Sequence, residues 1–157
     1  MKHKEGIINP NPDYENVTTT VKLNGKDVKI HGLCVGTVAV KTTFKTKKGD
    51  GFMSKINILL AGYYTEYMPI WVWVIEHPEG TIVIDTGENA DSMEVDKYLS
   101  NESWYARFQF KNACNVKIRR QSEINRQLEK INIKIDDVKL VVLTHMHRAE
   151  VTKFSEA

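Results

Sequence analysis

The chain has 157 residues, of which 41% are hydrophobic and 27% are charged, and its formal net charge at pH 7 is +2. This composition is that of an ordinary folded domain and excludes a fibrous or disordered chain. So small a net charge gives no support for binding to nucleic acid or to an anionic membrane. The longest apolar stretch, from Met68 to Ile75, is too short to span a bilayer. We therefore expect one cytoplasmic domain over residues 1–157, with no nucleic-acid or membrane partner.

Strand and turn signals fill the first half of the chain. Residues 1–16 are polar and rich in proline, which predicts an irregular lead-in. An Asn-Gly pair at residues 24–25 lies within residues 21–30 and predicts a tight hairpin turn there. Alternating small and polar residues predict a further strand over residues 35–44. A second hairpin is predicted from residues 70–75, a turn at residues 77–80 and a returning strand at residues 81–84.

Helical patterns dominate the second half. A short helix is predicted over residues 91–100, and a longer one over residues 118–131, where Ile124, Leu128 and Ile131 have helical spacing. A final strand is predicted over residues 138–143. Because the strand at residues 70–75 is apolar on both faces, we expect layers covering it on both sides.

The final strand runs directly into Thr144-His145-Met146-His147. Alternate residues of an extended strand point to the same side, so His145 and His147 can present imidazoles to one ion. Zinc prefers nitrogen and sulfur ligands, and a catalytic zinc site usually takes three protein ligands and leaves one position for water. Two histidines are therefore the beginning of a metal site, and two unrelated surface histidines remain the simpler interpretation of the pair alone.

Asp85 comes at the end of the returning strand of the second hairpin, in the sequence Ile84-Asp85-Thr86-Gly87. A carboxylate in this place can orient a ligand histidine or hold a water beside a metal. The alternative is that Asp85 only caps a turn through its own backbone. For this stretch by itself, the turn cap is the simpler interpretation.

The two motifs together are more specific. Residues 30–147 show a definite order of elements. A strand leads into the turn His77-Pro78-Glu79-Gly80 and then into the segment that ends in Asp85-Thr86-Gly87. Helices follow, and after them comes a strand that ends in Thr144-His145-Met146-His147. This order resembles the metallo-β-lactamase superfamily, and within it the N-acyl-homoserine lactonase-like branch. The resemblance implies an α+β fold, part of an αββα sandwich with a mixed sheet and flanking helices. It also implies a metal-dependent hydrolase of lactones or esters that uses one or two zinc ions.

In that family the strand is followed by the pattern H-x-H-x-D-H. His145 and His147 match its first two metal ligands, whereas Ala149 and Glu150 stand where the family has Asp and His. Ala149 cannot bind a metal, and Glu150 remains as an acceptable carboxylate ligand. His3, His31 and His77 are the other histidines from which a third ligand would have to come. The remaining ligands of the family belong to the second half of its fold, so we expect a truncated chain that is inactive or weakly active.

Three functional hypotheses follow. The chain is the N-terminal part of a lactonase-like metallohydrolase, or a half-fold interaction module without catalysis, or a minimal hydrolase with one metal on His145, His147 and Glu150. Half a sandwich leaves an apolar sheet face uncovered, which for the second hypothesis favours a homo-oligomer. Trp71, Trp73 and Trp104 are candidates for an acyl-chain pocket, although core packing is the simpler interpretation of at least two of them.

Overall fold

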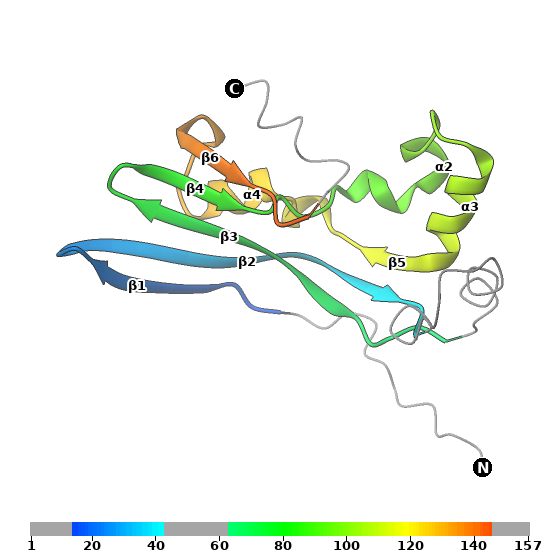
Figure 1. Ribbon diagram of the computed structural model, residues 1–157, viewed down its shortest axis with the longest axis horizontal. Helices are drawn as coiled ribbons and strands as arrows, with labels where there is room; N and C mark the ends of the chain where they lie inside the picture. The colour runs from blue at the N-terminus through cyan, green and yellow to red at the C-terminus, as the bar shows by residue number, and fades with distance from the viewer. Residues whose placement is uncertain (1–13, 43–62, 146–157) are drawn as a thin grey trace, which may run out of the picture.

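The computed structural model describes residues 14–42 and 63–145. Within these ranges the strands form one mixed six-stranded sheet in the order β1-β2-β3-β4-β6, and β5 pairs with β2 (Figure 1). All neighbouring strands are antiparallel except β4 and β6, which run parallel. The predicted α+β class with a mixed sheet and flanking helices is therefore confirmed.

The first hairpin joins β1 (Val17–Leu23) to β2 (Lys26–Val40), and its turn lies where the Asn-Gly pair predicts it. Asn24 has a φ of 51° and Gly25 a φ of 79°, the left-handed pair that a two-residue hairpin requires. β2 is 15 residues long. The strand predicted from residue 35 is thus the continuation of β2 past an irregularity between Cys34 and Gly36.

The second hairpin also matches its prediction. β3 (Met68–His77) and β4 (Gly80–Ile84) pair antiparallel around a turn at Pro78-Glu79. β6 (Val138–Val142) then lies parallel to β4, with Ile84 opposite Val142. Because the strands are parallel, the residues that follow β4 and those that follow β6 leave the sheet at the same edge.

The helices differ more from the predictions. The short helix predicted over residues 91–100 is split into η2 (Ala90–Met93) and α2 (Val95–Tyr98). The aromatic stretch after it forms α3 (Trp104–Ala113), which continues into β5 (Cys114–Lys117). The remaining short elements are η3 (Arg120–Ser122), which precedes helix α4 (Ile124–Lys130), and η4 (Ile135–Asp137), which precedes β6. No helix in the described ranges is long and apolar enough to cross a bilayer.

The helix predicted over residues 118–131 is shorter than expected. Helix α4 covers only Ile124–Lys130, because Glu123 has extended backbone angles and its Oε1 accepts a hydrogen bond from the Ala90 N–H at 3.1 Å. Ile118 is buried but not helical, and it packs over Gly36, where a Cβ atom would lie 2.7 Å from its Cγ1. Packing against distant residues therefore overrides the helical spacing at this end.

One face of the sheet carries the hydrophobic core. Side chains of β2, β3 and β4 pack there against α4, which lies against this face of the sheet (Figure 1). The buried members of this cluster are Leu33, Val35, Val72, Val74, Val83, Ile124, Leu128 and Ile133. Burying apolar side chains of this size contributes about 1.5–3 kcal/mol each, so this cluster contributes strongly to the stability of the fold.

The opposite face of the sheet is apolar but open within the described ranges. Trp73 is 42% exposed, Leu140 52% and Val142 41%, although Trp71 and Trp73 stack with their ring centroids 6.2 Å apart. The expected cover on both sides of β3 is thus found on the α4 side only, because the described residues form one sheet. The prediction that at least two of the three tryptophans pack in the core is therefore wrong, since Trp104 on α3 is 73% exposed and Trp73 is exposed as well.

Candidate functional site

Two strand ends bring Asp85 and His145 together. Asp85 follows β4 and His145 lies just past β6, and the backbone N–H of Asp85 donates to the carbonyl of Val142 at 2.8 Å. The parallel pairing of β4 and β6 thus continues one residue beyond the strands. This backbone contact fixes the position from which the Asp85 side chain reaches the segment after β6.

Asp85 holds the residue that precedes the histidine. Its carboxylate accepts two hydrogen bonds from Thr144, one from the backbone N–H at 2.8 Å and one from the hydroxyl at 2.7 Å. Asp85 has a φ of 59°, a left-handed conformation that aspartate adopts more readily than most residues. The interpretation of Asp85 as a residue that only caps its own turn is therefore incomplete, since its carboxylate bridges to a segment 59 residues away.

The Thr144 hydroxyl also contacts the imidazole of His145, with 2.9 Å between Oγ1 and Nδ1. A threonine hydroxyl has one proton, and an ionised carboxylate only accepts hydrogen bonds. With that proton donated to Asp85, a hydrogen bond between Oγ1 and the ring requires the tautomer of His145 that carries its proton on Nδ1. In that tautomer, Nε2 carries the lone pair that a metal ion would take up.

The residues after Asp85 are tightly packed. Thr86 is 1% exposed, and its hydroxyl has no hydrogen-bond partner among the described residues. Gly87 has a φ of 70°, and a Cβ atom at this position would collide with the side chain of Val35. The Asp85-Thr86-Gly87 segment is therefore held against the core, which gives the Asp85 carboxylate a fixed base.

The other histidines of the described ranges are placed elsewhere. His31 is buried between Thr18, whose hydroxyl lies 2.9 Å from Nδ1, and Glu76, whose carboxylate lies 2.8 Å from Nε2. His77 lies at the end of β3, where its Nδ1 accepts from the backbone N–H of Glu79. Neither histidine belongs to a group of three or more candidate metal ligands among residues 14–42 and 63–145, so neither is placed as the third ligand that the sequence left open.

The described ranges hold part of the predicted metal site. His145 lies within them, and its lone-pair nitrogen and hydrogen-bonded second nitrogen fit what zinc requires of a histidine ligand. His147 and Glu150 lie outside the described residues, as does His3. Among residues 14–42 and 63–145 there is no group of three or more His, Cys, Asp or Glu side chains that would hold a metal ion. The ligand set predicted from the sequence therefore stays a prediction.

Sequence reasoning missed Thr144. The signal was present, since a hydroxyl residue stands directly before the His-x-His pair. Its role depends on Asp85, however, and the pairing of two strand ends 59 residues apart cannot be read from the local sequence.

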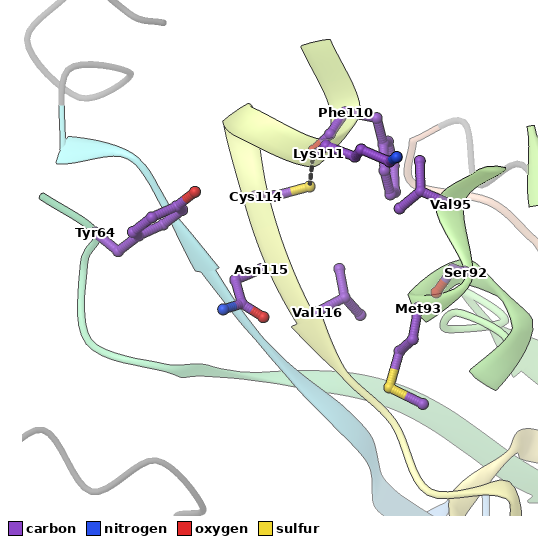
Figure 2. Close-up of a pocket in the computed structure, with 9 residues that line it drawn as sticks. All are labelled: Tyr64, Ser92, Met93, Val95, Phe110, Lys111, Cys114, Asn115 and Val116. Carbon is purple, nitrogen blue, oxygen red and sulfur yellow. Dashed lines mark hydrogen bonds between the residues drawn. The ribbon is translucent and has the colours of Figure 1, made fainter. Parts of the chain in front are cut away.

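A separate pocket of about 370 Å³ lies between η2 and the junction of α3 with β5. Figure 2 shows the Cys114 thiol directed at the carbonyl of Phe110, to which it donates over 3.7 Å. Burial raises the pKa of the Cys114 thiol above its ordinary value of 9.0, and the nearby charge of Glu88 raises it further. The thiol is therefore protonated at neutral pH and is not an activated nucleophile. Asp85 and His145 are not among the residues that line this pocket.

The family model of the metallo-beta-lactamase superfamily matches residues 66–147, which include β3, β4, β6 and the whole segment from Thr144 to His147. The chain belongs to the metallo-beta-lactamase superfamily. No curated protein matches its sequence.

Several solved structures resemble part of this chain. The AiiA protein of B. thuringiensis, solved as a mutant with N-decanoyl-L-homoserine bound at its active site, is 17% identical with a TM-score of 0.52. The alignment covers 75% of this chain and 40% of that one. An N-acyl homoserine lactone hydrolase with N-hexanoyl-L-homoserine at its catalytic metal centre is 16% identical with a TM-score of 0.49. Its alignment covers 71% of this chain and 38% of the hydrolase chain.

A third structure, AidC, is described as a dizinc quorum-quenching lactonase, and its alignment is 15% identical with a TM-score of 0.46 over 87% of this chain and 38% of that one. This superfamily member thus spans about two fifths of the length of the solved structures that it resembles. At these identities the likeness concerns the fold.

Proposed function

We propose that this chain carries the first metal-binding strand end of a lactonase-like hydrolase that acts on lactones or esters with zinc as cofactor. His145, His147 and, as a third ligand, Glu150 are its proposed metal ligands, and Asp85 supports His145 through Thr144. The observation that carries the proposal is the contact between Asp85, Thr144 and His145 at two neighbouring strand ends of a superfamily member. The proposed cytoplasmic location and the single domain over residues 1–157 remain predictions.

A zinc ion held by these ligands would supply Lewis-acid chemistry, because it would bring the pKa of a water to near neutrality and so provide hydroxide for attack on a carbonyl carbon. The residues of this chain would hold and orient the ligands of that ion. Asp85 and Thr144 fix the ring of His145, and the strand β6 sets the direction in which the segment leaves the sheet. Since two histidines and one carboxylate make a minimal site, we expect activity to be weak or absent in this chain alone.

Metal content tests the proposal. The chain is purified from medium supplemented with zinc, dialysed, and measured for bound zinc by mass spectrometry, with N-hexanoyl homoserine lactone hydrolysis assayed beside it. We expect about one zinc per chain in the wild type and loss of that zinc in the variants His145→Ala and His147→Ala. The matched control is His77→Ala, which removes a histidine engaged in a turn and leaves zinc content unchanged.

Each outcome decides between the hypotheses. Zinc with lactone hydrolysis supports an active minimal hydrolase, and zinc without hydrolysis supports a metal-binding part that needs further ligands for catalysis. A wild-type chain that is folded but retains no zinc contradicts the metal proposal. The variant Glu150→Gln separates the ligand sets, because it weakens zinc binding only if that carboxylate is the third ligand.

We also propose an alternative in which the chain is a non-catalytic module that associates with a second copy of itself through the open sheet face. Strand register sets which residues of β3, β4 and β6 share this face with Trp73. Apart from the strand-end residues Pro69, His77 and Gly80, they are Trp71, Ile75, Ile82, Ile84, Leu140 and Val142. None of them is charged. Two identical copies of such a face meet without repulsion between like charges, whereas exposed apolar patches are rarely left uncovered.

Sedimentation velocity over a range of concentrations tests the alternative. We expect a dimer in the wild type and a shift to monomer in Leu140→Glu, because a carboxylate would be buried in the contact. Trp104→Glu is the control, since Trp104 is an exposed aromatic residue on α3, outside the face. A wild type that sediments as a monomer at all concentrations rejects the association.

A further inference from the structure

The geometry points to Thr144 as the positioning residue that selects the ring tautomer of His145. The inference rests on the proposed function, since it names the device that prepares one proposed ligand, but its own test needs no metal. Thr144 touches neither a substrate nor the proposed ion. It acts through the imidazole whose Nδ1 lies 2.9 Å from its hydroxyl oxygen.

Thr144 donates two hydrogen bonds to the Asp85 carboxylate. The hydroxyl of Thr144 lies 2.7 Å from Oδ2 of Asp85, while the backbone N–H of Thr144 binds Oδ1 of the same carboxylate at 2.8 Å. Both carboxylate oxygens are thus engaged by one residue, which fixes the rotation of the threonine side chain. With its only proton directed at Asp85, the hydroxyl turns a lone pair toward His145.

The consequence concerns the nitrogen that remains. In water a neutral histidine chain favours the form with the proton on Nε2, which leaves Nδ1 to bind a cation. Here the acceptor at Nδ1 reverses that preference and leaves the lone pair on Nε2, the nitrogen farther from the backbone. A ring fixed in this way loses less freedom on binding an ion, which is how hydrogen-bonded supports raise metal affinity.

The two contacts of the Thr144 hydroxyl, with Asp85 and with His145, also explain why a hydroxyl residue stands at this position. Valine has the same shape and favours the same strand-like backbone, so packing alone would accept it. The side chain is exposed, and no core contact requires the hydroxyl. Valine has no hydroxyl, so it cannot link the Asp85 carboxylate to the imidazole of His145 by hydrogen bonds.

The test compares wild type, Thr144→Ser and Thr144→Val in the metal-free chain. Long-range proton–nitrogen NMR reads the tautomer of each histidine at a pH where its own titration shows the ring to be neutral. The signal of His145 is identified by its loss in His145→Gln. We expect the proton on Nδ1 in the wild type and in Thr144→Ser, and mainly on Nε2 in Thr144→Val.

A second readout is zinc affinity by competition with a chromophoric chelator. We expect the dissociation constant to rise about 10- to 100-fold in Thr144→Val and less than about 3-fold in Thr144→Ser, as for the loss of a supporting hydrogen bond. Thermal melts of the three proteins confirm that each is folded. His31, whose ring is held by Thr18 and Glu76, is the internal reference and keeps its tautomer in all three proteins.

Two results would overturn the inference. One is a wild-type His145 that carries its proton on Nε2, a measurement that does not depend on any variant. The other is a Thr144→Val protein with the wild-type tautomer. A wild type that binds no zinc but shows the expected tautomer change contradicts the proposed function and leaves the role of Thr144 intact.

Discussion

Gly87 lies against the side chain of Val35, so closely that a single methyl group on Gly87 would collide with it. The contact joins the segment after β4 to the centre of the core, since Val35 is fully buried. It holds that segment two residues beyond Asp85. The position of the candidate site therefore depends on the contact of Gly87 with Val35, as well as on the strands that carry Asp85 and His145.

Gly87→Ala is expected to be strongly destabilising. The substitution adds a clash with Val35 to a φ of 70° that alanine disfavours, for a combined loss of about 2–4 kcal/mol and roughly 5–15 °C in melting temperature. Gly25→Ala is the matched control: its φ is 79°, but nothing lies within 4 Å of the added Cβ. Its loss should be only about 1 kcal/mol. Equal losses in the two variants, measured by urea unfolding, would show that the Val35 contact is unimportant.

Thr86→Val should leave stability unchanged or raise it. The Thr86 hydroxyl is buried and has no hydrogen-bond partner among the described residues, so removing it relieves an unmet desolvation cost while valine keeps the shape. Thr86→Ser keeps the hydroxyl and removes the methyl group, which should cost about 1 kcal/mol. Denaturant midpoints of the two variants give the comparison. A loss above about 1 kcal/mol in Thr86→Val would reveal a bound water or another group on the hydroxyl.

Acid should weaken the Glu76 contact. Burial alone would raise the pKa of Glu76, but the hydrogen bond from His31 and the charge of Lys29 hold that pKa below its ordinary value of 4.5. A carboxyl whose pKa is lower in the folded state stabilises the fold above its unfolded pKa. This stability is lost as pH falls below 4.5 and through the folded value.

The variant Glu76→Gln measures this term, because glutamine keeps the shape of the side chain and removes its titration. We expect the wild type to be more stable than Glu76→Gln above about pH 5, and the difference to shrink steadily as the pH is lowered. Urea unfolding over a pH series provides both curves. Parallel curves over that range would contradict the assignment.

The two faces of the sheet should respond differently to truncation. Leu128 on α4 is 1% exposed and belongs to the core cluster, so Leu128→Ala should cost about 2–5 kcal/mol. Leu140 on β6 is 52% exposed, and Leu140→Ala should change the unfolding free energy by about 0.5 kcal/mol at a dilution where the chain is monomeric. Thermal unfolding monitored by circular dichroism compares them. A large loss at Leu140 would mean that the open face is covered.

Local signals explain which elements the sequence predicts correctly. Both hairpins lie where turn residues separate strand-forming runs, because the positive φ angles at Asn24 and Gly25 depend on those residues alone. Helix α4 begins later than its apolar spacing suggests, because Glu123 binds the backbone of Ala90 and Ile118 packs on Gly36. Both contacts join residues more than thirty positions apart in the chain. The local sequence around the helix therefore does not reveal them.

The candidate site divides in the same way. The strand that ends in His145 and the carboxylate at Asp85 could both be predicted, since each follows a run of strand-forming residues. Their connection through Thr144 could not, because it requires β4 and β6 to pair in parallel. Within residues 14–42 and 63–145, the predicted cover of the central strand is found on the α4 side, while Trp73 on the other side is exposed.

Turn chemistry and side-chain alternation act over a few neighbouring residues, so the two hairpins, the last strand and the residues that this strand delivers can be predicted without coordinates. Which carboxylate reaches His145, and through which hydroxyl, follows from the tertiary structure. The physical reason is that hydrogen bonds have direction and short reach, so their partners are chosen by how distant strands pair and pack.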